Sequence, residues 1–160
     1  MTESSGAVEI RSAASPADLA EVAALFREYA DGLGFPLDFQ DFESELRRLP
    51  GEYVRPGGAL GLARVDGRAA GCVALRPLSD AVCEMKRLYV RPEFRRAGLG
   101  RALADWILRE ARASGYARLR LDTVGTMHGA LRLYRSMGFV PIPPYRFNPM
   151  PGAVYLELRL

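Results

Sequence analysis

The stretch CEMKRLYVRPEFRRAGLGRALADWIL, residues 83–108, decides how the rest of the chain is read. A strand-like apolar run ends at Val90, paired arginines follow, and Gly98 and Gly100 open into a helical pattern. Backbone N–H groups at a helix N-terminus lack intrahelical partners and lie at the positive end of the helix dipole. Glycines let such a turn approach an anion closely, so the stretch predicts a phosphate or pyrophosphate site. The alternative is an ordinary helix start.

Hydrophobic periodicity on both sides of this stretch predicts a mixture of strands and helices. Ser15 before Pro16, with Asp18 three residues after Ser15, predicts a capped helix start. Asp66-Gly67 between two apolar runs predicts a hairpin. The predicted strands are residues 7–12, 58–65, 68–78, 81–90, 116–124, 139–142 and 153–160, and the predicted helices start at 16, within 38–49, after 98 and within 129–137. A mixed sheet with helices on its faces buries these stripes.

Composition limits the classes of protein. One domain spanning 1–160 is expected, with no membrane span, and without a signal-peptide pattern the expected location is cytoplasmic. Twenty-two cations against 19 anions, without a basic run, argue against a nucleic-acid partner. Cys72 and Cys83 lie in apolar runs and are interpreted as core thiols, with a ligand or nucleophile as the alternative. With His128 as the single histidine, on the expected surface, no metal site is predicted.

Two motifs together resemble the GNAT superfamily of acyl-CoA-dependent N-acetyltransferases. The first is Arg95-x-x-Gly98-x-Gly100, which lies behind the run Leu88-Tyr89-Val90. The second is ALRLYRSMGF, residues 130–139, with a tyrosine and a Gly-Phe pair. In element order the resemblance extends over roughly residues 7–160. It implies an α/β (α+β) fold: a mixed, mostly antiparallel, twisted sheet of six to seven strands flanked by about four helices.

The resemblance also implies acetyl-CoA as cosubstrate. Backbone amides of the turn would hold its pyrophosphate, and this turn comprises Arg95, Arg96, Ala97, Gly98, Leu99, Gly100 and Arg101. The pantetheine arm would pair like an added strand with the main chain of Leu88, Tyr89 and Val90. Many members carry Asn where this chain has Met127, so the resemblance implies no contact from an Asn side chain to the arm here.

Two side chains match the catalytic positions of the resembling family. Glu84 would accept a proton from the amine, directly or through water. Its alternative is an exposed strand glutamate or a salt bridge to Arg87 or Lys86, the only lysine of the chain. Tyr134 would donate its phenol proton to the leaving sulfur, and its alternative is a half-buried aromatic on a helix stripe.

The acceptor pocket would lie between the first two helices and the loop before the last strand. Phe35, Tyr145, Arg146 and Phe147 are its predicted contacts, although the aromatics could equally pack the two segments together. The predicted function is acetyl transfer to a primary amine of a small molecule or peptide, by a monomer or homodimer. The alternative function is a non-catalytic acyl-CoA-binding sensor or regulatory module.

Overall fold

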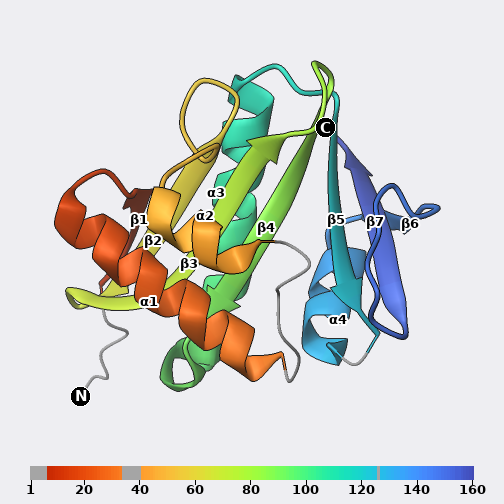
Figure 1. Ribbon diagram of the computed structural model, residues 1–160. Coiled ribbons are helices and arrows are strands. Elements are labelled where there is room, and N and C mark those ends of the chain that lie inside the picture. Colours follow the sequence, from red (N-terminus) through yellow and green to blue (C-terminus); the bar gives the residue numbers. More distant parts are fainter. Residues whose placement is uncertain (1–6, 34–40, 126) are drawn as a thin grey trace.

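The structure, a computed structural model, describes residues 7–33, 41–125 and 127–160, and of residues 96 and 97 it describes only the backbone. Strands and helices follow one another along the chain in the order that the sequence predicts (Figure 1). The strands are β1 (Val8–Ser12), β2 (Ala59–Val65), β3 (Arg68–Pro77), β4 (Val82–Val90), β5 (Arg118–Val124), β6 (Val140–Pro141) and β7 (Ala153–Arg159). The α-helices are α1 (Pro16–Gly32), α2 (Phe42–Arg48), α3 (Leu99–Ala113) and α4 (His128–Ser136). A 3₁₀ helix, η2 (Pro92–Ala97), which the sequence did not reveal, precedes α3.

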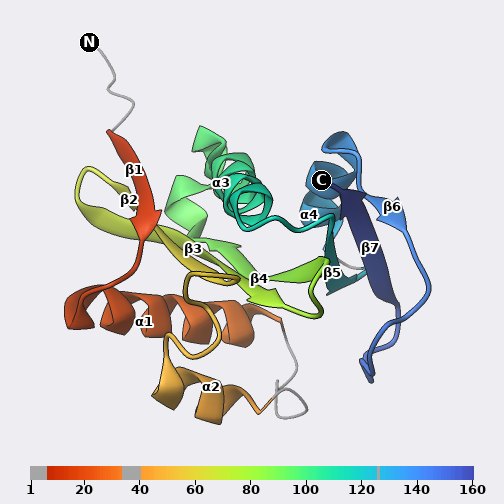
Figure 2. The same cartoon turned by 90° about the horizontal axis from the view of Figure 1, so that it is seen from above.

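The strands form one seven-stranded sheet in the order β1-β2-β3-β4-β5-β7-β6. Neighbouring strands are antiparallel except β4 and β5, which run parallel. Helices α1 and α2 cover one face of the sheet, and α3 and α4 cover the other (Figure 2). Two apolar cores follow from this three-layer arrangement, one under α1 and α2 and a larger one under α3 and α4. The predicted fold class is confirmed.

Local chemistry explains where the elements begin and turn. The Ser15 hydroxyl accepts from the Asp18 N–H at 3.0 Å, and the Asp18 carboxylate accepts from the Ser15 N–H at 3.4 Å, so the predicted capping box starts α1. Asp66 and Gly67 both have positive φ, 51° and 80°, as a two-residue type I′ hairpin requires. The expected helix within 38–49 begins at Phe42 in the described part, and residues 38–40 lie outside it.

A bulge in β4 shapes the centre of the sheet. Arg87 and Leu88 together lie opposite Val73 of β3, because the register shifts between Cys72 and Ala74. Arg87 takes a φ of 62°, a left-handed conformation that costs a residue with a side chain about 1–2 kcal/mol. Bulges of this kind bend a strand and increase its twist. The bulge therefore turns the second half of β4 away from its parallel neighbour.

Packing on α2 holds the bulge in place. The Arg87 guanidinium is 4% exposed and donates to both carboxylate oxygens of Glu45, at 3.0 and 2.8 Å. It also lies over the Phe42 ring, 5.3 Å from the centroid. Strands β4 and β5 pair through only three residues each, and the last pair is Glu84 with Arg120. Beyond that point the strands separate, and the separation creates the site.

Within the described ranges, no helix is long and apolar enough to cross a membrane.

Candidate active site

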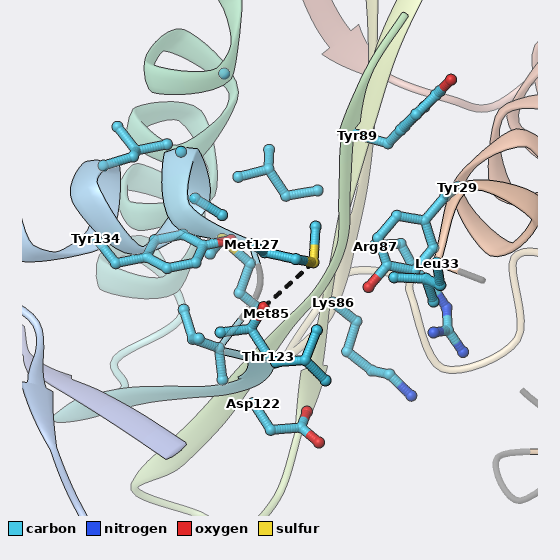
Figure 3. A pocket seen from close by; sticks show the side chains of 18 of the residues that line it. Tyr29, Leu33, Met85, Lys86, Arg87, Tyr89, Asp122, Thr123, Met127 and Tyr134 are labelled. Atoms are coloured by element: carbon cyan, nitrogen blue, oxygen red, sulfur yellow. Dashed lines mark hydrogen bonds between the residues drawn. The ribbon is translucent and has the colours of Figure 1, made fainter. Parts of the chain in front are cut away.

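A cavity of about 620 Å³ opens where β4 and β5 separate. One wall is β4 from Met85 to Val90, and the opposite wall is β5 from Leu121 to Val124 with α4. The end of α1 and the loop before β7 close it on the side of the α1–α2 layer. Figure 3 shows side chains from these separate elements converging on one space. The cavity depends on the bulge, since regular β4–β5 pairing would fill it.

The glycine turn lies at one end of this cavity. Gly98 has a φ of 71°, a conformation that favours glycine, and its carbonyl accepts the N–H of Ala102 in the first turn of α3. Gly100 lines the cavity, and a Cβ added there would meet only side-chain carbons at 3.9 and 4.0 Å. The space in front of Gly100 is therefore open to a ligand, and the first N–H groups of α3 lack intrahelical acceptors.

The other residues of the predicted turn differ in what their side chains do. Arg95 lines the cavity, and its Nε donates to the Val90 carbonyl at 2.8 Å, which fixes the turn to the end of β4. Leu99 is 1% exposed and belongs to the core. Arg101 is exposed and bonds Asp105 at 3.2 Å. Leu99 and Arg101 can therefore contribute backbone alone, as the anion-site interpretation assumes.

The predicted strand for the pantetheine arm also lies on the cavity wall. Leu88, Tyr89 and Val90 all line the cavity, and their β5-facing edge is beyond the last β4–β5 pair at Glu84. A ligand can add main-chain hydrogen bonds to such a strand edge. Met127, the departure from the resembling motif, lines the cavity as well and accepts a hydrogen bond from the Thr123 hydroxyl at 3.5 Å (Figure 3).

Tyr134 extends from α4 into the cavity wall (Figure 3). The residue is 6% exposed, and its ring packs against Phe139 with the centroids 5.5 Å apart. Burial raises the pKa of the Tyr134 phenol above its ordinary range, so the hydroxyl keeps its proton at neutral pH. A protonated phenol that faces a cavity can donate a proton or a hydrogen bond there.

Glu84, the predicted base, lies on β4 but outside the lining of the cavity. Its carboxylate is fully buried and does not line the cavity. One oxygen accepts from Arg76 Nε at 2.8 Å, and the other accepts from the Tyr145 hydroxyl at 2.6 Å with Arg146 Nε at 3.4 Å. The alternatives that the sequence left open were an exposed strand glutamate and a salt bridge to Arg87 or Lys86. Glu84 is fully buried, and its ion pairs are with Arg76 and Arg146. Sequence spacing missed the true partners because they come from β3 and from the loop before β7.

The predicted acceptor contacts are divided by the structure. Arg146 lines the cavity, where its Nη2 donates to Asp122 at 2.7 Å. Tyr145 turns instead toward Glu84, and Phe147 is 76% exposed and does not line the cavity. Phe35 lies outside the described residues. Arg146 is thus the one predicted acceptor contact that the described chain brings to the cavity.

Several cavity residues were not predicted. Tyr29 and Leu33 come from the end of α1, and Lys86 and Asp122 come from the two strands that separate. A second cavity of about 180 Å³ lies beneath α2, and among the described residues Lys86 alone lines both. A single lysine among many arginines could have drawn attention to Lys86, but composition alone does not say where in the fold that lysine lies.

The remaining sequence interpretations concern residues away from the chemistry. Cys72 and Cys83 are both buried, and burial raises the pKa of each thiol, that of Cys83 to about 12. They are core thiols, as predicted. His128 is exposed at the start of α4, on the rim of the cavity. No cluster of His, Cys, Asp and Glu suited to a metal ion occurs among the residues whose placement is described.

Comparisons with known proteins agree with this geometry. The chain is 40% identical over 155 residues to an uncharacterized N-acetyltransferase of Schizosaccharomyces pombe, covering 96% of this chain and 95% of that protein. Its fold is similar to that of an acetyltransferase from Streptococcus agalactiae, with a TM-score of 0.79 at 23% identity over 96% of this chain and 98% of that one. It is also similar to yncA, a putative acetyltransferase from Salmonella typhimurium solved with its cofactor acetyl-CoA, with a TM-score of 0.69 at 20% identity over 96% and 94% of the chains.

Residues 20–139 match the acetyltransferase (GNAT) family. That match covers most of the chain, including the glycine turn, the β4 edge and the tyrosine of α4. The chain belongs to the acetyltransferase (GNAT) family, and it is an N-acetyltransferase.

Proposed function

We propose that the protein transfers the acetyl group directly from acetyl-CoA to a primary amine of a small molecule or peptide, with both substrates bound together. The observation that carries the proposal is the cavity between β4 and β5, which has a protonated tyrosine on one wall and a polar acceptor side on the other. Direct transfer needs both substrates in one space, because the amine nitrogen must approach the thioester carbon.

The residues present fit acetyl-CoA. Open space at Gly100 and the first N–H groups of α3 suit the pyrophosphate, and Arg95 adds positive charge at the same end. The unpaired edge of β4 from Leu88 to Val90 suits the amide groups of the pantetheine arm. When bound, acetyl-CoA supplies the thioester that is cleaved. Holding the arm along the strand would bring the acyl end toward the bulge.

Tyr134 holds the proton that the leaving sulfur requires. Its hydroxyl has no hydrogen bond to another described residue, so it is available to a ligand in the cavity. A phenol that is protonated at neutral pH can act as a general acid without competing with an internal acceptor. We propose that Glu84 does not contact the substrates but acts as a positioning residue, which holds Tyr145 and Arg146 beside the acceptor.

The acceptor would occupy the side of the cavity nearest α1 and the loop before β7. Tyr29 and Leu33 offer an apolar surface there, and Asp122 and Arg146 offer polar groups. The Asp122 carboxylate is bonded by Arg146 and by Asn148 Nδ2 at 3.0 Å, which fixes all three side chains in place. This mixture suits a small amine with an apolar portion and a second polar group.

A panel of primary amines, including short peptides with free N-termini, tests the proposal. We expect amine-dependent release of the CoA thiol together with the acetylated amine in the mass spectrum. Binding of acetyl-CoA measured by calorimetry separates an inactive protein from an unsuitable panel. Tight acetyl-CoA binding with only slow, amine-independent thiol release would contradict the proposed transfer and favour the sensor function.

A further inference from the structure

Lys86 holds a position that no other described cation shares. It is the only lysine of the chain, and it stands on β4 directly before the bulge, just after the last β4–β5 pair. Its side chain lines both the main cavity and the smaller cavity beneath α2. Figure 3 shows its side chain extending from β4. An arginine here would stay charged, whereas a lysine can lose its proton.

Charged groups surround Lys86 on several elements. From the sheet and the last loop, the titratable and charged residues that face Lys86 are Arg76, Glu84, Arg87, Asp122 and Arg146. From α2 and its surroundings, including the smaller cavity, they are Asp41, Glu45, Arg48, Glu52 and Tyr53. Of these, Asp41, Arg48 and Glu52 are exposed. The balance between the acids and the arginines decides whether Lys86 keeps its charge.

The nearby carboxylates are already engaged by arginines. Glu45 is bonded twice by Arg87, and both oxygens of Glu84 are occupied as described above. Asp122 accepts from Arg146, and Glu52 lies 3.3 Å from Arg76. No ion pair or hydrogen bond joins the Lys86 ammonium to another described residue. Burial and the cationic neighbours Arg87 and Arg146 oppose the charge of the lysine, and they outweigh Glu84 and Glu45, which favour it.

We infer that Lys86 is the general base of the transfer, taking a proton from the acceptor amine in the cavity. The assignment rests on the proposed function and adds a residue to it. Among the described side chains on the acceptor side, Asp122 holds two donors on its oxygens, and Arg146 cannot accept a proton. Lys86 is the remaining group there that can be neutral and basic at once.

The proton balance of the step is complete. An acceptor that arrives as an ammonium gives one proton to Lys86 Nζ and becomes nucleophilic. The N–C bond then forms and the C–S bond of the thioester breaks. The sulfur takes the proton of the Tyr134 hydroxyl, and the second amine proton returns to Tyr134, directly or through solvent. Lys86 releases its proton to water, which is the one net proton of amide formation from an ammonium.

Burial, together with Arg87 and Arg146, lowers the pKa of Lys86 to about 7. A large fraction of the side chain is then neutral at neutral pH, where an exposed lysine with a pKa of about 10.4 would be almost fully charged. General bases are most effective when their pKa lies near the working pH. Below about pH 7 the lysine becomes protonated, and the rate should fall with it.

One experiment reads the proton on Lys86 without any substrate. Protein grown on lysine labelled with carbon-13 at Cε gives a single side-chain resonance, because the chain has one lysine. The variant Arg109→Lys adds a reference lysine on an exposed position of α3 that lines neither cavity. We expect the Lys86 resonance to titrate near pH 7 and the reference near its ordinary value. Two overlapping titrations near the ordinary value would overturn the inference.

A kinetic experiment then separates a base from a mere positive charge. Lys86→Arg keeps the charge and the length but cannot accept a proton. With the best amine of the panel, we expect kcat at neutral pH to fall by about 10²-fold, with the acid limb near pH 7 lost and activity rising at alkaline pH. Lys86→Met should behave in the same way.

The outcomes distinguish this inference from the proposed function. Turnover by the parent protein with an undiminished kcat in Lys86→Arg would support amine acetylation and refute the base. If Lys86→Arg keeps kcat and Lys86→Met raises only KM, the lysine anchors the acceptor and the inference is wrong. No acetylated amine from a parent protein that binds acetyl-CoA would refute the proposed function, and with it the assignment.

Discussion

The Tyr145 hydroxyl donates a 2.6 Å hydrogen bond to the buried Glu84 carboxylate, and this contact fastens the loop before β7 to the position where β4 leaves β5. The same carboxylate also compensates Arg76 and Arg146. Glu84 thus joins β3, β4 and the last loop next to the cavity without entering it. A carboxylate in this position both orders the acceptor side of the cavity and stabilises the fold.

Glu84→Gln should therefore lower stability as well as activity. The amide keeps the shape but removes the buried charge that Arg76 and Arg146 share, which leaves them with Glu52 and Asp122 alone. Breaking a buried pair costs about 3–5 kcal/mol. Thermal unfolding should show a clearly reduced Tm. Glu43→Gln is the matched control, because Glu43 forms an exposed pair with Arg27 that contributes little. Equal melting of the two variants would show that the Glu84 network is not stabilising.

Tyr134→Phe should separate chemistry from packing. Removing the oxygen leaves the ring against Phe139, so Tm and acetyl-CoA affinity should change little. Turnover with the best amine should fall by about 10²-fold, because the sulfur loses its proton donor. Tyr116→Phe is the opposite control. The Tyr116 hydroxyl lies outside the cavity and donates to the Gly57 carbonyl at 2.6 Å, so this variant should lower Tm and leave kcat unchanged. A parental kcat in Tyr134→Phe would exclude the general acid.

The two glycines of the turn should respond differently to substitution. Gly100→Glu puts a bulky anion into the open space at the end of the cavity, so calorimetry should show a large loss of acetyl-CoA affinity in a folded protein. Gly100→Ala should fold normally and bind more weakly than the parent. Gly98→Ala should instead lower the free energy of unfolding by about 1 kcal/mol, because a side chain at this positive φ is strained, and Tm should fall with it. Unchanged affinity in Gly100→Glu would remove the pyrophosphate site from this turn.

Asp18 should make the fold sensitive to acid. N–H groups of Ala14 and Ser15 and the guanidinium of Arg64 lower the pKa of Asp18 from 3.8 to about 2. A lowered folded-state pKa contributes stability that is present above about pH 4 and is lost as the pH falls toward 2. We expect Asp18→Asn to cost about 2 kcal/mol at neutral pH and progressively less in acid.

Urea unfolding at a series of pH values measures this linkage. The free-energy difference between parent and Asp18→Asn should shrink between pH 4 and pH 2. Asp80→Asn, at an exposed loop position without an ion pair to a described residue, is the control and should show no such trend. A constant difference across the series would mean that Asp18 acts through shape alone.

Much of the molecule follows from local sequence rules. The capping box at Ser15, the Asp66-Gly67 hairpin and the apolar stripes of α3 and β7 each depend on neighbours within a few residues, so pattern alone predicts the element order. These elements use the short-range periodicity that a sequence displays directly. The glycine turn and the tyrosine of α4 each belong to a contiguous motif, and it is the resemblance of these motifs to the family that predicts their roles.

Only the tertiary structure decided which side chains share the cavity. Glu84 and Lys86 are two residues apart on one strand, yet one is fully buried among arginines and the other lines the cavity. Their fates depend on Arg76, Tyr145 and Arg146, which are brought to β4 by strand pairing and by the return of the chain before β7. The charge and proton affinity of a side chain depend on burial and on distant partners, and no local pattern records either of them.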